Sequence, residues 1–540
     1  MQEQKRQQRA HLHSAQGHRR SAGNDLERPQ DPELERDPSR SAEGSTVCAA
    51  FAPQDQSSQH LVRPSGKRSG AKDRELLRRP TTIEGGRMMR AVVFVCTLAA
   101  CTFAFVAADG AATAPPTLVV DDDRAQCGNA DFTTIQAAVD AAPEDGLVRV
   151  CPGLYAEQVS VPESLTIGGN AETVEAVDCF APTRPTADPN TQAIVVAPSG
   201  ATAGAPAVVF DLQADNIELE GFVLPGRTGS TSGVRTSSAH SGYRIHHNLI
   251  MATTVAVYFR SSGVYPSNFD HNCLRENSWG VINHYLPLSN ARIHHNSTFR
   301  TAAHAFDQTS NCPEFLETGD FLSCSASRVG MDHVVYDHNM SIGDAVGNSG
   351  VYWFASSTST TAFENTVVPA GRRAMMLFGA NYDLHIIDNH LEVPQVGLAR
   401  QSTPAAPPNF RVLIRGNTIT GAPGNDPSVP TAGIGMGVDG LKNSWILDNV
   451  ISGLAAGEGI ALLAGNTDNL VRGNKITNND KDGIRVAAGA TGNTFEANEI
   501  LGNGRILGFV DARDDARDFN VWRGNVCLTD FPAGTICGIG

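Results

Sequence analysis

The chain has 540 residues, of which 18% are charged, and its formal net charge is −15. The first 87 residues hold 16 of the 42 basic and 12 of the 57 acidic side chains, so the remaining chain carries a net charge of −19. A body this acidic argues against nucleic acid as the main partner.

Residues 1–87 differ in composition from the rest of the chain. They are rich in Gln, Arg, Ser and Pro, and they show no apolar periodicity. Such a segment cannot bury a core, so we predict that it is disordered. Alternatively, this segment is an upstream extension that is not part of the protein, and translation starts at Met88 or Met89.

Residues 88–112 have the pattern of a secretory signal peptide. Arg87 and Arg90 flank two methionines, an apolar stretch runs from Ala91 to Ala108, and small residues follow. We therefore predict a secreted protein whose mature form has no transmembrane segment. Two alternatives remain: the apolar stretch could serve as a signal anchor, or Cys101 could carry a lipid anchor.

Residues 113–540 are predicted to form one folded domain, and its first element is a helix. Thr133 or Thr134 can cap this helix, and Pro143 ends it. Its apolar residues fall on one stripe, so the helix would cover the open end of the structure that follows. They are Ile135, Ala138, Val139 and Ala142.

From residue 248 onward, asparagine recurs about every two dozen residues between two short apolar runs. A period this regular indicates a solenoid. A buried asparagine at each turn can bond the asparagine of the next coil, so we interpret the series as structural. Its members are Asn248, Asn272, Asn296, Asn339, Asn365, Asn389, Asn417, Asn449, Asn474, Asn498 and Asn525.

Each repeat contains three short apolar runs separated by three turns. The runs are too short for helices and suit strands. Later repeats add a Gly-Ile pair, as at Gly459-Ile460 and Gly483-Ile484. The predicted fold is therefore all-β, a single right-handed parallel β-helix solenoid with an N-terminal capping helix.

These repeats, together with the segment DFTTIQAAVDAAPEDGLVRVCPGLYAEQVSVPESLTIGG (131–169), resemble the pectin lyase-like superfamily. The resemblance covers about residues 117–537. It implies a parallel β-helix with a polysaccharide or cell-surface glycan as partner. Calcium is a possible cofactor by this resemblance only, and the sequence itself indicates no cofactor.

The catalytic motifs of this superfamily do not identify an activity here. Asp270, Arg275 and Arg292 are the residue types that pectate lyases use, but no lyase motif surrounds them. The characteristic strings of pectinesterases and polygalacturonases are missing. Tyr336-Asp337-His338 resembles a mannuronan epimerase motif only weakly.

The predicted mature chain contains eight cysteines, an even number that favours disulfides in an exported protein. We expect Cys127 to pair with Cys151, Cys312 with Cys324, and Cys527 with Cys537. Cys179 and Cys273 remain as the least certain pair.

The best candidate site is a column of histidines that precede ladder asparagines. His247, His271, His295 and His338 would stack in successive coils beside His246, Asp270, His294 and Asp337. Such neighbours can couple their titrations and provide a general base. A solvated polar stripe is the structural alternative. We predict no metal site, because nothing fixes the number or geometry of ligands.

Within this column we assign the catalytic residues to Asp270, His271, Asp337 and His338, with Arg275 or Arg292 neutralising a substrate carboxylate. The predicted substrate-binding residues are His247, His295, Trp279, Tyr285 and Trp353. Seven arginines against two acids in residues 225–305 suggest a basic belt for an acidic glycan. A loop insertion at residues 310–330 could wall the site.

The sequence therefore predicts an exported, monomeric β-helix protein that engages polysaccharide along one lateral face. In the enzymatic interpretation it cleaves that polysaccharide as a lyase or a glycoside hydrolase. In the alternative interpretation it is a non-catalytic structural or adhesive protein of the cell surface or extracellular matrix.

Overall fold

The computed structural model describes residues 116–198, 207–226, 231–283, 286–309, 331–344, 350–369, 371, 373–394, 396–400, 408–422 and 431–537. The predictions for residues 1–87 and 88–112, for Tyr285 and for the Cys312–Cys324 pair lie outside these residues. Among the described residues no helix has the length and apolar character needed to cross a membrane.

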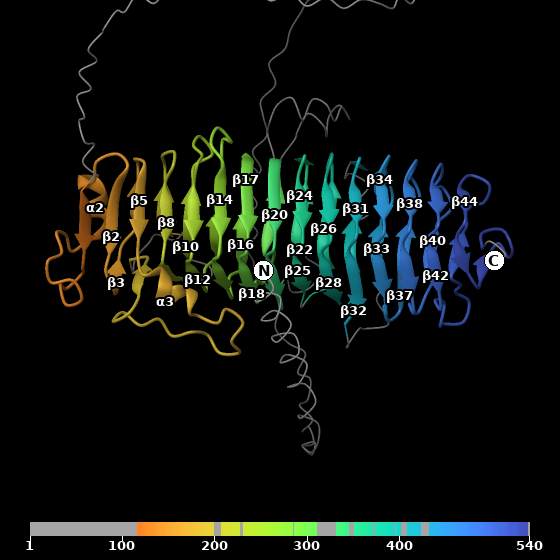
Figure 1. Ribbon diagram of the computed structural model, residues 1–540, viewed down its shortest axis with the longest axis horizontal. Coiled ribbons are helices and arrows are strands. Elements are labelled where there is room, and N and C mark those ends of the chain that lie inside the picture. The colour runs from red at the N-terminus through yellow and green to blue at the C-terminus, as the bar shows by residue number, and fades with distance from the viewer. Residues whose placement is uncertain are drawn as a thin grey trace, which may run out of the picture. The chain divides into compact units, whose positions relative to one another are not determined.

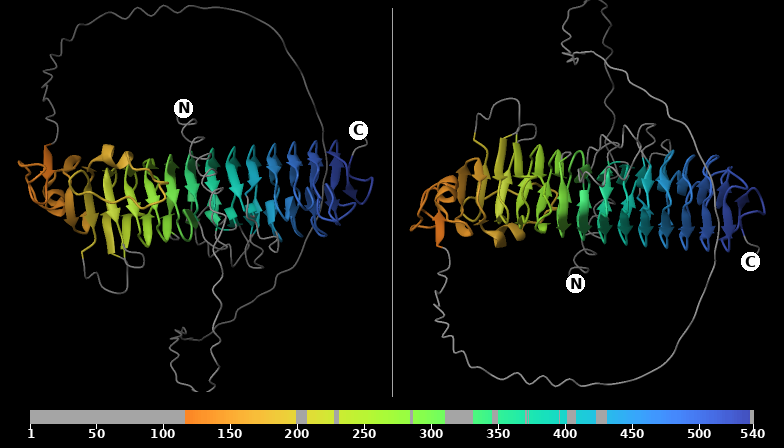
Figure 2. Two further views of the ribbon diagram at one scale, coloured as in Figure 1. Left: turned by 90° about the horizontal axis from the view of Figure 1, so that it is seen from below. Right: turned by 90° about the horizontal axis from the view of Figure 1, so that it is seen from above.

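Strands dominate the described chain, and they form three long parallel sheets that run side by side along the stack of coils (Figures 1 and 2). Each coil contributes one strand to each sheet in turn, so consecutive strands of one sheet are one coil apart in the sequence. The predicted parallel β-helix is confirmed.

Sheet A contains, in order, β1 (Thr117–Val120), β2 (Gly146–Val150), β5 (Leu165–Gly168), β8 (Glu218–Glu220), β11 (Arg244–His246), β14 (Ser267–Asp270), β17 (Leu288–His294), β20 (Met331–Asp337), β24 (Thr361–Phe363), β27 (His385–Ile387), β31 (Leu413–Arg415), β35 (Trp445–Leu447), β38 (Leu470–Arg472), β41 (Thr494–Glu496) and β44 (Val521–Arg523), with β23 (Ser357–Thr358) beside β20.

Sheet B contains β3 (Gly153–Ala156), β6 (Ala193–Val196), β9 (Phe222–Pro225), β12 (Leu249–Met251), β15 (Cys273–Arg275), β18 (Ser297–Phe299), β21 (Met340–Ile342), β25 (Thr366–Val368), β28 (His390–Val393), β32 (Thr418–Gly421), β36 (Val450–Ser452), β39 (Lys475–Thr477), β42 (Glu499–Leu501) and β45 (Val526–Cys527).

Sheet C contains β4 (Val159–Val161), β7 (Ala207–Leu212), β10 (Thr231–Thr236), β13 (Val255–Tyr258), β16 (Trp279–Ile282), β19 (Phe306–Thr309), β22 (Gly350–Ala355), β26 (Arg373–Gly379), β29 (Val396–Arg400), β33 (Thr431–Met436), β37 (Gly457–Leu462), β40 (Ile484–Val486), β43 (Ala512–Asp514) and β46 (Asp530–Phe531). A separate pair joins β30 (Asn409–Phe410) to β34 (Leu441–Lys442).

Two short helices accompany the strands in the described part of the chain. In α2 (Ile135–Ala141) the hydroxyl of Thr134 accepts from the backbone N–H of Ala137, as expected of the N-cap. Ile135, Ala138 and Val139 are buried in the main hydrophobic core, next to β1 and β2. The helix thus exists where the sequence predicts it, and its role as a cap over the first coil stays a prediction. The second helix is α3 (Ala171–Glu175).

The eleven asparagines predicted from the repeat form one continuous ladder at the corner between sheets A and B. The Nδ2 of every member except Asn525, the last, donates to the Oδ1 of the next asparagine over 2.9–3.1 Å, and each member is at most 2% exposed. The same Oδ1 atoms also accept from the backbone N–H groups of the coil before, as from Asn272 to Asn296 over 3.0 Å. Buried polar groups at this corner are therefore satisfied along the ladder.

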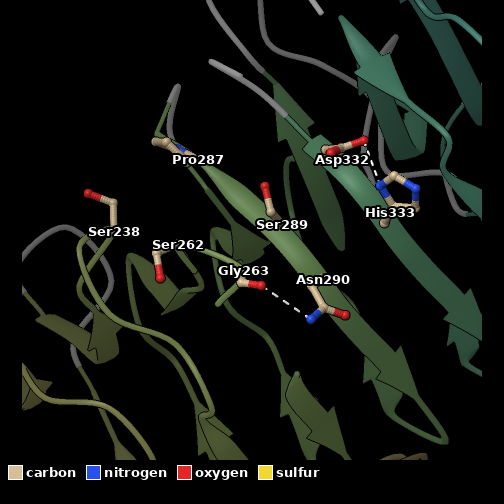
Figure 3. A pocket seen from close by; sticks show the side chains of 8 residues that line it. All are labelled: Ser238, Ser262, Gly263, Pro287, Ser289, Asn290, Asp332 and His333. Atoms are coloured by element: carbon tan, nitrogen blue, oxygen red, sulfur yellow. Dashed lines mark hydrogen bonds and ion pairs between the residues drawn. The ribbon is translucent and has the colours of Figure 1, made fainter. Parts of the chain in front are cut away.

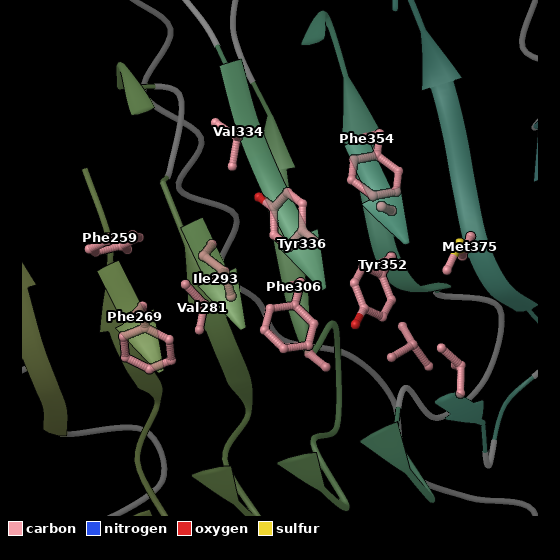
Figure 4. Close-up of a cluster of buried hydrophobic side chains, with 14 of the residues drawn as sticks. Phe259, Phe269, Val281, Ile293, Phe306, Val334, Tyr336, Tyr352, Phe354 and Met375 are labelled. Carbon is pink, nitrogen blue, oxygen red and sulfur yellow. The ribbon is translucent and has the colours of Figure 1, made fainter. Parts of the chain in front are cut away.

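The core lies between the three sheets and is filled by alternate residues of each strand. Figure 4 shows the middle of it, where Phe269, Ile293 and Tyr336 come from sheet A and Phe306 and Tyr352 come from sheet C. The rings of Phe306 and Tyr352 are 4.8 Å apart. Because side chains alternate along a strand, the residues next to these core positions must point outward and are available for a site.

Candidate functional site

The predicted histidine column exists, and strand register sets it. In sheet A, His246 pairs with Asp270, Asp270 with His294, and His294 with Asp337. One residue later, at the corner, the rings of His247, His271, His295 and His338 stack. Their centroids are 5.0, 5.1 and 4.8 Å apart, with interplanar angles of 12° or less.

The corner backbone explains why these histidines point away from the core. The residue before each ladder asparagine has a positive φ, between 51° and 68° along the whole ladder. This left-handed conformation turns the chain from sheet A into sheet B, and glycine, Asp, Asn and His tolerate it best. The side chain at this position therefore stacks on its counterparts in the neighbouring coils.

Two of the predicted catalytic pairs are in hydrogen-bond contact. The Nδ1 of His271 lies 2.8 Å from Oδ2 of Asp270, and the Nδ1 of His338 lies 2.8 Å from Oδ2 of Asp337. His338 also places its Nε2 2.6 Å from Oε2 of Glu364. Both nitrogens of His338 thus face carboxylates, whereas His271 bonds through Nδ1 and has a side chain that is 41% exposed.

Electrostatics keep the carboxylates of these pairs ionised. Burial would raise the pKa of Asp270, but the hydrogen bond from His271 and the neighbouring His294 outweigh burial and lower this pKa. Asp337 behaves in the same way: the bonds from Arg292 and His338 outweigh burial and lower its pKa. An ionised Asp270 can only accept, so Nδ1 of His271 carries the proton that they share.

Two other histidines of the column, His247 and His295, favour the neutral form. Burial, with the neighbouring His271 and His338, lowers the pKa of His295 to about 4. Burial, with His246 and His271, also lowers the pKa of His247. Crowding of imidazoles along the column therefore disfavours charging every ring at once.

The first coils of the column contain carboxylates that the sequence pattern did not reveal. Glu218 and Glu220 of β8 lie beside His246, whose Nε2 is 2.9 Å from Oε1 of Glu218 and whose Nδ1 is 3.4 Å from Oε2 of Glu220. His246 and His247 approach each other through their Nδ1 atoms at 2.9 Å. Phe222 takes the place of the ladder asparagine in this coil, so the repeat gave no register for β8.

A stapled loop walls one side of the column. The chain after α3 crosses the outside of sheet B, where the Cys179–Cys273 disulfide fixes it. Arg184 of this loop donates to Glu276 over 2.8 Å, and Phe180 packs edge-on against Phe299. The expected disulfides Cys127–Cys151 and Cys527–Cys537 are present as well. The predicted wall at 310–330 lies outside the described residues.

The predicted arginines have different environments. Arg275 is fully buried beneath the stapled loop, where it donates to the carbonyl of Cys179 over 3.3 Å and lies over the ring of Phe299. It cannot reach a substrate carboxylate from this position, because sheet B and the loop cover it. Arg292 is half exposed and holds Asp337 through two bonds of 2.8 and 2.7 Å.

The basic belt expected in residues 225–305 is largely neutralised. Arg235 pairs with Asp211, Arg244 with Glu218, and Arg292 with Asp337. These three acids come from coils before and after the belt. A count of charges within residues 225–305 does not include these three acids. Stacking of the coils brings them next to the arginines, because each acid lies one coil away from its partner.

The two predicted tryptophans, Trp279 and Trp353, lie on sheet C. Sheet B separates them from the histidine column, which lies at the corner between sheets A and B. Trp353 stacks on His304 at 4.7 Å and on Phe378 at 5.0 Å, and Trp279 meets His304 edge-on. The faces of Trp353 are thus occupied within this row. His304 also bonds Asp307 over 2.7 Å, a buried pair that the sequence interpretation missed. His304 lies in the turn before β19 and Asp307 lies in that strand, so the spacing of three residues matched no repeat position.

A polar hollow opens at the other edge of sheet A, where sheets C and A meet (Figure 3). Its volume is about 540 Å³. Its lining includes hydroxyl, amide and carboxylate groups beside apolar carbon surface, and the Nδ1 of His333 lies 2.8 Å from Oδ1 of Asp332. The lining residues are Ser238, Ser262, Gly263, Pro287, Ser289, Asn290, Asp332 and His333.

Comparison with known proteins gave one match to a family profile. Residues 333–526, less than half of the chain, match the profile of a family described as periplasmic copper-binding protein (NosD). No curated protein matches the sequence significantly.

Several solved structures are similar in three dimensions. The DFA-IIIase of Arthrobacter chlorophenolicus is 14% identical, with 76% of this chain and 100% of that chain covered and a TM-score of 0.42. The A-module of a mannuronan C-5 epimerase from Azotobacter vinelandii is 15% identical, with 73% and 94% covered and a TM-score of 0.39. The catalytic domain of a GH87 alpha-1,3-glucanase is 12% identical, with 73% and 67% covered and a TM-score of 0.37. The three parallel sheets and the asparagine ladder identify the architecture of the chain as a parallel β-helix of stacked repeats.

Proposed function

We propose that this chain is an exported protein that binds a polysaccharide across the outer face of sheet A and transfers a proton on it through the Asp270–His271 pair. One observation carries the proposal. His271 is oriented by an ionised carboxylate through Nδ1, while its ring is 41% exposed at the surface. This is the arrangement of a histidine that acts as general base or acid through its other nitrogen.

The neighbouring rings support this assignment of roles. His338 faces a carboxylate with each nitrogen, so both of its nitrogens are already engaged and neither is open to a substrate. His295 is a neutral stacking neighbour of His271. We therefore assign proton transfer to His271, orientation to Asp270, and a positioning role to Asp337 and His338.

The polar hollow of Figure 3 is the proposed sugar subsite. Strand β17 leads from Asn290 at the hollow to His294 beside Asp270, a separation of about 13 Å for four residues of a strand. A chain of a few sugar units spans this distance. Arg292 lies between the two ends and is half exposed, so it is the cation best placed to meet a uronate carboxylate.

Three disulfides among the described residues support export to an oxidising compartment. The reaction class that fits one exposed histidine beside an ionised carboxylate is proton abstraction or protonation at a glycosidic bond. This covers both a lyase and a hydrolase, and the products distinguish them: a lyase forms an unsaturated sugar, and a hydrolase forms only new reducing ends.

We expect His271→Ala to reduce turnover by roughly 10²–10⁴-fold, which is the usual contribution of a general acid or base. The measurement uses a panel of uronate-containing and neutral glycans, read for unsaturated products and reducing ends. His390→Ala, on sheet B at a distant coil, is the matched control and should retain wild-type turnover. Ser289→Trp should fill the hollow and weaken glycan binding while leaving the Asp270–His271 pair intact.

The alternative is a rigid, non-catalytic rod of the cell surface or matrix. The long stacked row of imidazoles and the continuous ladder would then serve only to hold the coils in register. Absence of turnover on every glycan of the panel, with glycan binding unchanged in His271→Ala and Ser289→Trp, would establish this alternative and reject the proposed site.

A further inference from the structure

The N-terminal end of the histidine column contains a group of side chains that the proposed glycan site does not use. Glu220, His246 and His247 place one carboxylate oxygen and two imidazole nitrogens within 4.8 Å of one another. They come from two successive coils, with β8 supplying Glu220 and β11 with its corner supplying the histidines.

The distances in this group match the spacing of ligands around one metal ion. The two Nδ1 atoms are 2.9 Å apart, and Nδ1 of His246 is 3.4 Å from Oε2 of Glu220. Metal bonds of about 2.0–2.2 Å place neighbouring ligand atoms about 2.9 Å apart at a right angle and about 3.3 Å apart at a tetrahedral angle. Small rotations of the side chains would therefore bring all three onto one ion.

A second carboxylate fixes the tautomer that metal binding needs. Oε1 of Glu218 lies 2.9 Å from Nε2 of His246, so that nitrogen donates and Nδ1 of His246 keeps its lone pair. Metal-binding histidines usually donate their other nitrogen to a carboxylate in this way. The proton that Nδ1 of His247 shares with His246 can move to its own Nε2 when an ion enters.

The surroundings make the site partly closed. The side chain of His246 is 10% exposed, that of Glu218 is 22% exposed and that of Glu220 is 34% exposed. The carboxylate of Glu175, at the end of α3, is close enough to act electrostatically on His247. The loop that follows α3 is held over sheet B by Cys179–Cys273. Arg244 pairs with Glu218 over 2.7 Å, and none of the ion pairs among the described residues joins an arginine or lysine to Glu220.

A similar trio three coils later is less suited to a cation. His295, Asp337 and His338 also lie within 4.8 Å of one another. However, Asp337 is already bound by two nitrogens of Arg292, whose positive charge opposes a second cation. His338 is held between Asp337 and Glu364. Within the described part of the chain, no arginine binds Glu220, the carboxylate ligand of the first trio, in this way.

We propose that Glu220, His246 and His247 form a binding site for one divalent first-row transition-metal ion, with Glu218 orienting His246. Two imidazoles and one carboxylate suit Zn²⁺, Co²⁺ or Cu²⁺ and do not suit Ca²⁺ or Mg²⁺, which prefer oxygen ligands alone. This proposal does not depend on the glycan site, because metal binding and glycan turnover are measured separately.

The test is titration of the tag-free, chelator-treated full chain with Zn²⁺ by calorimetry, and with Co²⁺ by visible absorption. We expect one Co²⁺ with the spectrum of a low-coordinate, nitrogen-containing site. His247→Ala and Glu220→Gln should each weaken Zn²⁺ binding by at least about 100-fold, and Glu218→Gln by about 10–100-fold, the range for a residue that orients a ligand. His390→Ala should bind as the wild type does, and it controls for histidines elsewhere in the chain.

The unfolding temperature of each variant without metal shows whether it folds. Glu218→Gln and Glu220→Gln keep the size and shape of the side chain, whereas His247→Ala removes a ring from the stack of imidazoles. Equal Zn²⁺ affinity in the wild type, His247→Ala and Glu220→Gln would overturn the proposal. Loss of binding in His295→Ala with retention in His247→Ala would also overturn it, because the ion would then occupy the later trio.

Discussion

Asn339→Ala is expected to lower the free energy of unfolding by roughly 3–5 kcal/mol, the largest single-residue effect that the fold predicts. Asn339 is 1% exposed and lies in the middle of the ladder. Its Oδ1 accepts from the backbone N–H and the Nδ2 of Asn296, and its Nδ2 donates to Ile293 and Asn365. Alanine leaves these partners buried without replacement bonds, and each such group costs about 1–3 kcal/mol.

Denaturant unfolding followed by intrinsic fluorescence measures this effect. Asn268→Ala is the matched control, because Asn268 lies on the outer face of β14, is half-buried and should change stability by no more than about 0.5 kcal/mol. A stability of Asn339→Ala within 1 kcal/mol of this control would mean that the ladder adds little beyond the strand hydrogen bonds.

Asp344→Asn is expected to stabilise the protein, and the gain should grow as the pH rises from about 4 to 7. Asp344 is completely buried and accepts from the backbone N–H of Thr301 over 2.6 Å and from the hydroxyl of Thr298. Burial raises the pKa of Asp344 to about 7, although the bonds from Thr298 and Thr301 act in the opposite direction. Asn277 occupies the same role two coils earlier, where its Oδ1 accepts from the backbone N–H of Thr253 over 3.0 Å, so an amide fits this corner.

The sign follows from the raised pKa. The stability that protonated Asp344 contributes is complete below about pH 4 and is lost as the pH rises through about 7, because the unfolded chain releases the proton more readily. The amide does not titrate. A shift of about three pKa units corresponds to at most about 4 kcal/mol between the two proteins above pH 7.

Unfolding free energies at pH 4, 5, 6, 7 and 8 for the wild type and Asp344→Asn test this prediction. Glu144→Gln removes one exposed carboxylate outside the core and controls for the change in net charge. A difference between the wild type and Asp344→Asn that is the same at pH 4 and pH 8 would contradict it.

The fold was predictable because the repeat reports a physical constraint. A ladder asparagine such as Asn272 must bond the coil on either side, so no other side chain replaces it easily. The histidine column was predictable for the same reason: once the asparagines are aligned, His271 must lie beside His247 and His295.

The parts of the site outside the regular repeat were not predictable. Phe222 occupies the ladder position one coil before the first asparagine, so nothing in the sequence placed Glu218 and Glu220 beside His246. Arg275 has the residue type of a catalytic group, yet the stapled loop buries it.

The sequence by itself determined the parallel β-helix, the register of its coils and the order of His and Asp along one corner. These properties are local or periodic, and the spacing of residues along the chain encodes them. The tertiary structure decided which charges are paired, where the loop fixed by Cys179–Cys273 lies, and which histidine nitrogens meet carboxylates. Those properties depend on contacts between irregular segments and neighbouring coils, whose geometry no single spacing contains.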